Sequence, residues 1–190
     1  MATNPQQDPR RMIVEDYLEF EKTSEIKHEY IDGYIYAMAG RTENHSLIST
    51  NLLATLHTQR RKHGCAVHTS DMRVQISESK YVYPDASIVC GEARLSLVNP
   101  TIVIEVMSPS SEAYDRGDKF EFYRKVSSLQ HYVLVSQEKP RIEGFTRQPS
   151  GLWTFSDAIG IDATFTIETG DFTLALVDIY ADIEFDRQDD

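Results

Sequence analysis

Apolar residues recur along the first third of the chain at spacings that predict two amphipathic helices. Residues 12–21 and 42–62 each carry apolar side chains three and four positions apart, which places them on one helix face. Thr42 or Asn44 is the expected N-cap of the second helix, because a short polar side chain can accept a hydrogen bond from the first turn. Gly64 is expected to end this helix.

Runs of β-favouring residues predict strands and turns between and after these helices. In HEYIDGYIYAMAG, Asp32-Gly33 predicts a two-residue hairpin turn, because both residues tolerate positive φ angles. The other expected elements are strands at 66–76, 81–90 and 101–107, a helix at 115–126, and short strands from HYVLVS onward. This order predicts an α/β protein with one domain, 1–190, in which residues 1–10 and 186–190 are flexible.

The composition is typical of a globular protein without a membrane span. Hydrophobic residues make up 41% of the 190 residues, and no apolar run approaches the roughly 18 residues that cross a bilayer. The N-terminal stretch lacks the apolar centre of a signal peptide. Two cysteines, Cys65 and Cys90, indicate neither a disulfide framework nor a zinc-ligand cluster, so we expect two small buried thiols in a reducing, cytoplasmic setting.

The net charge of −11 restricts the partners that the protein can bind. Proteins that coat nucleic acids gain much of their affinity by neutralising phosphates with Lys and Arg, and the acidic excess argues against that class. A localised nucleic-acid site on an otherwise acidic surface is still compatible with the sequence.

Two carboxylates interrupt otherwise apolar strands. Glu105 lies inside IVIEVM, and Asp85 follows Pro84 in YPDASIV. A buried carboxylate is costly unless it is paired or bound to a metal, so both need a partner. If the two strands form an antiparallel hairpin about Leu95, facing residue numbers sum to 190 and Asp85 lies opposite Glu105. Two carboxylates this close favour a divalent cation, and Mg²⁺ or Mn²⁺ suits a small set of oxygen ligands.

Lys119 is the third candidate, from the segment DRGDKFEFYRK. A helix here places Lys119 on the same face as Phe122, Tyr123 and Val126, so the ammonium points inward and can offset the charge of the carboxylates. The alternative is a lysine at the helix edge whose ammonium reaches water. Asp115 and Asp118 are interpreted as caps of the helix N-terminus.

Asp, Glu and Lys in this order resemble the PD-(D/E)XK nucleases, the restriction-endonuclease-like superfamily. Pro84-Asp85 matches PD, and Glu105 matches the acid of the second element. Met107 stands where that element has its lysine, and Lys119 from the next helix can supply it, as in some members of the superfamily. More closely, the chain resembles the Uma-two family of restriction-endonuclease-like proteins, in HEYIDGYIYAMAG, YPDASIV, IVIEVMSPSS, YDRGDKFEFYRK and HYVLVS.

This resemblance covers most of the chain and implies a fold and a chemistry. The implied fold is a restriction-endonuclease-like core, a mixed sheet of roughly four or five strands flanked by helices, with extra strands at the C-terminal end. The implied chemistry is metal-dependent hydrolysis of phosphodiester bonds, with Asp85, Glu105 and the backbone carbonyl of Val106 holding Mg²⁺. Lys119 would orient the attacking water or stabilise the developing negative charge.

Glu29 and His45 are secondary candidates. Members of the superfamily often place an additional acid from the N-terminal region near the metal, and Glu29 belongs to the family-like HEYIDG element. The alternative for Glu29 is a cross-strand or capping carboxylate. His45 lies at the head of the second helix, where a hydrogen-bonded packing residue is the alternative to a functional one.

These observations lead us to expect a Mg²⁺-dependent endonuclease acting on DNA. One alternative is a noncatalytic interaction or scaffold protein that keeps the nuclease fold, which the acidic net charge favours. Another is a metal-dependent hydrolase of a different phosphate ester. A homodimer is expected, because strands near the C-terminal end could pair with a second copy and cutting two strands suits two active sites.

Overall fold

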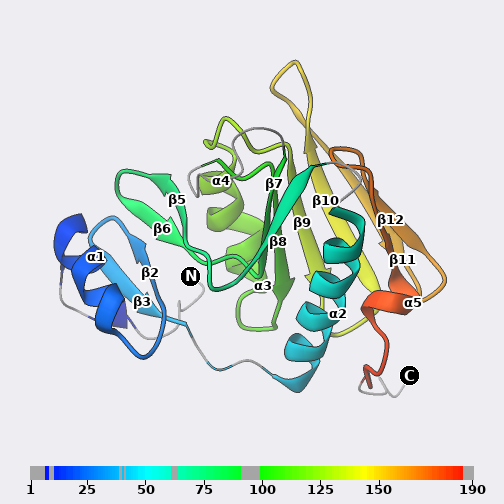
Figure 1. Cartoon of the computed structure of the whole chain (residues 1–190), viewed down its shortest axis with the longest axis horizontal. Helices are drawn as coiled ribbons and strands as arrows, with labels where there is room; N and C mark the ends of the chain where they lie inside the picture. Colours follow the sequence, from blue (N-terminus) through cyan, green and yellow to red (C-terminus); the bar gives the residue numbers. More distant parts are fainter. Residues whose placement is uncertain are drawn as a thin grey trace.

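A six-stranded mixed sheet forms the centre of the computed structural model, which describes residues 7–8, 11–38, 40, 42–60, 64–90 and 99–185 (Figure 1). The strand order is β11-β10-β9-β8-β7-β4; only β8 and β9 are parallel neighbours. These strands are β4 (Cys65–Thr69), β7 (Ala86–Cys90), β8 (Ile102–Met107), β9 (His131–Ser136), β10 (Arg141–Arg147) and β11 (Trp153–Ile159).

Helical segments cover both faces of this sheet, and the sheet buries apolar side chains on each. These segments are α2 (Glu43–Gln59), α3 (Glu112–Tyr114), the π-helix η2 (Asp115–Lys119), α4 (Phe120–Tyr123) and α5 (Leu176–Ile179). The remaining helix, α1 (Val14–Thr23), packs instead against Tyr30, Ile35 and Tyr81. One apolar cluster joins the sheet to α2 and α5, and another joins it to α4. Strands buried on both faces read as continuous apolar runs, which explains the composition of β8 and β9.

This architecture confirms the α/β class, with a mixed sheet, flanking helices and further strands at the C-terminal end. The main sheet has six strands where four or five were expected, because β10 and β11 extend it as a long hairpin instead of forming a separate unit. The hairpin β12 (Thr164–Ile167) and β13 (Phe172–Ala175) then packs against the α2 face.

A second sheet lies beside the main one and is built mainly from the N-terminal part of the chain (Figure 1). Its order is β1-β3-β2-β6-β5, comprising β1 (Gln7–Asp8), β2 (His28–Ile31), β3 (Tyr34–Ala37), β5 (Val74–Ser77) and β6 (Lys80–Val82). Asp32 and Gly33, with φ of 52° and 98°, form the turn between β2 and β3, as the sequence predicts. Tyr17 of α1 stacks on Tyr30 of this sheet, with ring centroids 4.8 Å apart.

Two strand predictions were wrong in extent. The segment 66–76 is divided into β4 and β5, and the segment 81–90 into β6 and β7; each pair is split between the two sheets. The second break falls at Pro84, which has no N–H group for a sheet ladder. Asp85 therefore stands at the point where the chain passes from one sheet to the other.

The expectation of two separate thiols was also wrong. Cys65 and Cys90 form a disulfide between β4 and β7. The antiparallel register places these two residues directly opposite each other, although 25 positions separate them in the chain. Such a pairing depends on strand register, which the spacing of two cysteines does not reveal.

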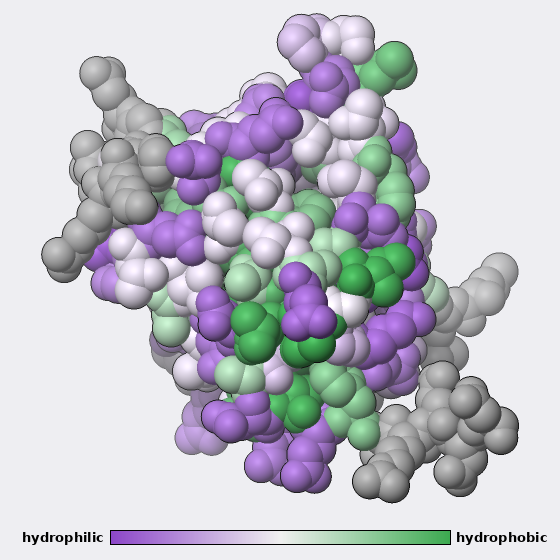
Figure 2. All heavy atoms as spheres, turned by 90° about the vertical axis from the view of Figure 1, so that its right-hand side faces the viewer, coloured by the Kyte–Doolittle hydropathy of each residue, from purple (hydrophilic) through white to green (hydrophobic). Residues whose placement is uncertain are grey.

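Two further features concern the surface and the chain ends. Figure 2 shows that apolar residues gather among hydrophilic ones on the side of the molecule that carries β11, β12 and α5. Among the described residues, none of the helices combines the length and apolar composition needed to cross a membrane. The segments predicted to be flexible, 1–10 and 186–190, lie outside the described residues apart from Gln7–Asp8.

Candidate active site

The strand pair β7–β8 brings the two unusual carboxylates to the same end of the main sheet. Ala86 faces Ile104 and Ile88 faces Ile102, so facing residue numbers sum to 190, as the sequence predicts. Asp85 directly precedes β7 and Glu105 directly follows Ile104, which continues the same register. The turn expected about Leu95 lies outside the described residues.

Asp85 is held by a backbone amide and by a histidine. Its Oδ2 atom accepts a hydrogen bond from the Val106 N–H, with an N···O distance of 2.7 Å, and lies 3.2 Å from Nε2 of His45. His45 belongs to the first turn of α2, where the predicted N-cap Thr42 accepts a hydrogen bond from its backbone N–H. The other ring nitrogen of His45 lies 3.3 Å from the Ser49 hydroxyl. The start of α2 thus positions Asp85.

Lys119 lies among three carboxylates. Its Nζ atom is 3.0 Å from Oε1 of Glu105, 3.1 Å from Oε1 of Glu29 and 3.8 Å from Oδ1 of Asp115. The lysine and these three carboxylates are all buried. The inward orientation predicted for Lys119 is therefore confirmed, and Glu29 reaches the same point from β2 of the second sheet.

The interpretation of Asp115 as a helix cap was wrong. The helical segment begins at Glu112, and Asp115 is the first residue of the π-helix that ends at Lys119. Within this turn both side chains are buried, whereas Asp118 is exposed at the cavity. The π-helical turn thus brings an additional carboxylate to the site.

Burial and mutual repulsion govern the ionisation of this group. Burial raises the pKa of Glu105 well above its usual value, and the charges of Asp115, Asp85 and Glu29 add to that effect. Burial likewise raises the pKa of Asp115. Burial alone would lower the pKa of Lys119, but the surrounding carboxylates outweigh it and raise the pKa, so the ammonium stays charged.

A cavity of about 710 Å³ gives access to these side chains. Five carboxylates line it, while Lys119 is the only lysine or arginine among its described lining residues. The hydroxyl of Tyr114 is buried at this cavity and has no hydrogen-bond partner among the residues that the structure describes. Because buried hydroxyls are normally paired, this O–H is available to a ligand oxygen. Burial raises the pKa of Tyr114 above its usual value, which keeps it a donor.

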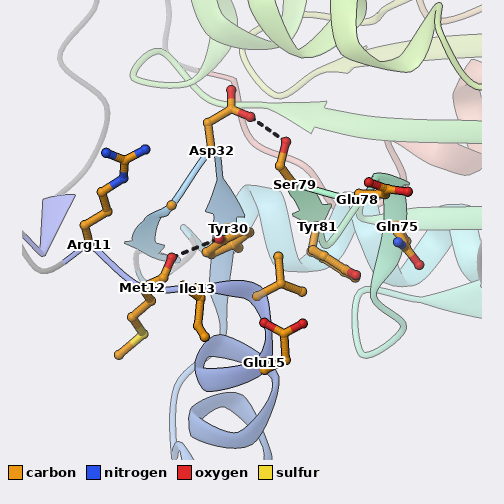
Figure 3. A pocket seen from close by; sticks show the side chains of 12 residues that line it. Arg11, Met12, Ile13, Glu15, Tyr30, Asp32, Gln75, Glu78, Ser79 and Tyr81 are labelled. Carbon is orange, nitrogen blue, oxygen red and sulfur yellow. Dashed lines mark hydrogen bonds between the residues drawn. The ribbon is translucent and has the colours of Figure 1, made fainter.

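A larger cavity, of about 930 Å³, lies between the start of α1 and the turns of the second sheet (Figure 3). Its carboxylates, Glu15, Asp32 and Glu78, point from separate edges and do not converge. Asp32 is already engaged, since it accepts a hydrogen bond from the Ser79 hydroxyl and pairs with Lys80. The smaller cavity is therefore the stronger candidate for chemistry.

The residues of the smaller cavity fit a hard divalent cation held by few protein ligands. In the described part of the chain, no group of three or more His, Cys, Asp or Glu side chains is arranged to hold a metal ion by itself. Mg²⁺ does not require such a group, because it is often held by one or two carboxylates and otherwise by water and substrate oxygens. Asp85 and Glu105 supply oxygen ligands in a site with excess negative charge, which suits this mode.

Three members of the site carried little signal in the sequence. Asp115 and Tyr114 lie in a segment that reads as an ordinary helix start, whereas Asp115 is a buried residue of a π-helix. Tyr123, whose hydroxyl donates to Oε1 of Glu105 at 3.3 Å, was recognised only as an apolar face residue. The helix face shared by Lys119, Tyr123 and Val126 was the one signal that could have indicated this contact.

Comparisons with known proteins agree with this fold. A family model described as "Uma2: Putative restriction endonuclease" matches residues 14–170. The uncharacterized proteins slr1290 and sll1609 of Synechocystis are 38% and 32% identical, over 80% and 78% of this chain and 83% and 88% of their own lengths. A crystal structure described as a "putative nuclease belonging to DUF820", from Anabaena variabilis, has a TM-score of 0.72 and 16% identity. That match covers 89% of this chain and 97% of the other, and it shows that the two share a fold.

Proposed function

The chain belongs to the Uma2 family of restriction-endonuclease-like proteins, and from this premise we propose that it is a nuclease that hydrolyses DNA with the help of Mg²⁺ or Mn²⁺. One observation carries the proposal. Asp85, Glu105 and Lys119 come from three separate elements and meet in one cavity, where the Lys119 ammonium lies 3.0 Å from Glu105. A buried cluster of this kind is costly for folding, which favours a chemical role.

Asp85, Glu105 and the carbonyl of Val106 are the proposed metal ligands. The Val106 N–H donates to Asp85, and the N–H and C=O of one residue in an extended strand point to the same side. The Val106 carbonyl therefore lies on the side of Asp85. When bound, a divalent cation lowers the pKa of a coordinated water and offsets negative charge on the phosphate.

The remaining side chains orient the reacting groups and stabilise charge. The Lys119 ammonium, held by Glu29 and Glu105, donates to the attacking water or to the phosphate oxygen on which charge develops. The Tyr114 hydroxyl donates to a second phosphate oxygen. His45 acts through Asp85, because its ring fixes the carboxylate oxygen that also accepts the Val106 N–H.

A second candidate function is a noncatalytic interaction protein that keeps this fold. The lining of the cavity favours it, because the five carboxylates and one lysine among its described residues provide little attraction for the many phosphates of a nucleic acid. Hydrolysis of a different phosphate ester is the third candidate, and it would use the same ligands on a substrate with fewer charges.

We also propose a cytoplasmic location, which the disulfide puts to the test. Disulfides are rare in reducing compartments. Alkylation of free thiols in intact cells, followed by mass spectrometry, would find Cys65 and Cys90 alkylated if the protein resides in the cytoplasm. If Cys65 and Cys90 instead escape alkylation because they are fully oxidised in these cells, that result would contradict the cytoplasmic location.

The test of the catalytic proposal combines metal binding with cleavage. Calorimetric titration with Mg²⁺ and with Mn²⁺ is run on the wild type, on Glu105→Gln and on Glu143→Gln, alongside cleavage of supercoiled plasmid DNA. Glu143 is a matched control, because both glutamates are 3% exposed and paired with cations, but Glu143 contacts Arg116 and Arg141 and does not line the cavity.

Metal binding and cleavage should both be lost in Glu105→Gln and kept in Glu143→Gln. Metal binding without plasmid cleavage would favour a different phosphate ester. An absence of binding at millimolar metal in the wild type would overturn the catalytic proposal in favour of the noncatalytic one. Equal losses in the two variants would show that the effect comes from disturbing any buried glutamate.

A further inference from the structure

The strand β11 forms one edge of the main sheet, and its outward backbone groups can be assigned from the register. In every facing β10–β11 pair, the two residue numbers sum to 300. Just beyond the ends of the ladder, the Gln148 N–H donates to the Leu152 carbonyl and the Gly160 N–H donates to the Pro140 carbonyl. The hydrogen-bonded pairs are therefore those of even-numbered residues. Antiparallel ladders alternate, so the N–H and C=O groups of odd-numbered residues point away from β10. The outward-facing residues are Trp153, Phe155, Asp157 and Ile159. In the described part of the chain no strand pairs with this edge.

The side chains around this edge are unusually apolar for a surface. Seven large hydrophobic residues of the described chain are exposed, and five of them fall between residues 152 and 177. Within β11, Phe155 is 52% exposed and Ile159 is 65% exposed. Figure 2 shows apolar residues gathered on the side that includes this strand. A concentration of this kind marks an interaction surface better than scattered single residues would.

The edge also lacks the features that usually prevent strand pairing. Natural edge strands are protected by Lys, Pro or a bulge, and β11 has no Lys or Pro and pairs with β10 without a register shift. Its one charged residue, Asp157, is paired with Arg141 at 2.9 Å. The protein carries a net charge of −11, so two copies repel each other over most of their surface. This locally neutral edge is where two copies can approach.

We propose that β11 pairs in antiparallel orientation with β11 of a second copy, which joins the two main sheets into one continuous sheet. A twofold axis beside Ser156 gives the longest overlap, because all four outward-facing residues then find a partner. In that register Trp153 faces Ile159 of the partner subunit. The two Asp157 side chains do not face each other, since each lies opposite Phe155 of the partner subunit. The contact is isologous, so it closes as a dimer.

Sedimentation velocity over a range of protein concentrations tests the proposal with charge-introducing variants. Ile159→Lys and Phe155→Lys place a charge at the edge. Ile26→Lys is the matched control, because Ile26 is 55% exposed and lies in the loop between α1 and β2, away from β11. The wild type and Ile26→Lys should be dimers, and both edge variants should dissociate with a dimer Kd raised by about tenfold or more. A monomeric wild type, or edge variants as dimeric as the control, would overturn the proposal.

Amide hydrogen exchange resolved by residue identifies the surface that pairs. In a monomer the even-numbered amides of β11 are protected by β10 and the odd-numbered ones exchange quickly; in the proposed dimer both sets are protected. A dimer whose odd-numbered β11 amides stay unprotected would overturn the proposal, because association would then use another surface. The result is separate from the nuclease proposal, since Ile159 does not line the cavity and Ile159→Lys should keep its metal binding.

Discussion

The Nζ atom of Lys119 lies 3.0 Å from Oε1 of Glu105, although one residue ends a π-helix and the other lies in the middle of a buried strand. The same ammonium also contacts Glu29 from the second sheet. Lys119 is therefore the point at which the strand, the helical segment and the N-terminal part of the chain are joined electrostatically. Both folding and chemistry should respond to its removal.

Replacement of this lysine should destabilise the fold strongly. Lys119→Met leaves three buried carboxylates without their cation, and breaking a buried ion pair from one side costs about 3–5 kcal/mol. Urea denaturation at neutral pH measures the loss. Lys125→Met is the control, because Lys125 forms an exposed pair with Glu121 at 3.2 Å and its loss should cost less than about 1 kcal/mol. Similar losses in the two variants would contradict the proposed burial of the cluster.

Tyr114→Phe should weaken activity and strengthen the fold. The variant removes a buried hydroxyl that has no partner within the described part of the chain, which should raise the free energy of unfolding by about 1–2 kcal/mol. If that hydroxyl donates to the substrate phosphate, cleavage should slow by about a hundredfold while metal affinity is unchanged. Tyr132→Phe is the control, because its hydroxyl donates to the Asp115 carbonyl at 2.9 Å and its loss should only destabilise. An unchanged cleavage rate in Tyr114→Phe would rule out the contact with substrate.

Acidification should destabilise the protein through His131. Burial lowers the pKa of this histidine below its ordinary 6.5, so the unfolded chain binds a proton more readily than the folded one. The free energy of unfolding should therefore begin to fall as the pH drops below 6.5, and the loss is complete once the pH is below the lowered pKa of the folded state. Urea denaturation at a series of pH values should show this loss, and His131→Asn should flatten it. A curve that is equally steep in the variant would assign the effect to other groups.

Reduction of the disulfide should lower thermal stability without abolishing the fold. The Cys65–Cys90 bridge closes a loop of 25 positions, and bridges of that span contribute about 2–4 kcal/mol. Calorimetry with and without reductant measures the difference, and Cys65→Ser combined with Cys90→Ser should match the reduced protein. A thermal midpoint that does not respond to reductant would mean that the strand pair β4–β7 is held by its ladder alone.

The sequence contained enough information to bring together the central residues of the candidate site. Apolar strands make an internal carboxylate conspicuous. A single assumption about register placed Asp85 opposite Glu105, and the β7–β8 ladder has that register in its last pair, Ala86 with Ile104. The helical spacing of Lys119, Tyr123 and Val126 predicted which way the lysine points. These inferences succeed because strand and helix periodicity are local properties of the chain.

Other features depend on contacts between distant segments and could not be read in this way. The division of the strands between two sheets, and the pairing of Cys65 with Cys90, result from the final packing of the sheets. The contact of Glu29 with Lys119 joins residues 90 positions apart and depends on how the two sheets meet. Periodicity within one segment carries no information of that kind.

The π-helix from Asp115 to Lys119 has a consequence for how this protein tolerates changes in length. A π-helical turn is an α-helical turn with one residue added, so a deletion at Gly117 could be absorbed by a regular helix without unfolding. After that deletion Asp115 and Lys119 would be three positions apart in an α-helix, a spacing that keeps two side chains on one helix face. The ion pair between them would therefore survive the loss of one residue. This turn should tolerate a one-residue deletion better than a regular α-helical turn does, because only the π-turn has a residue to spare.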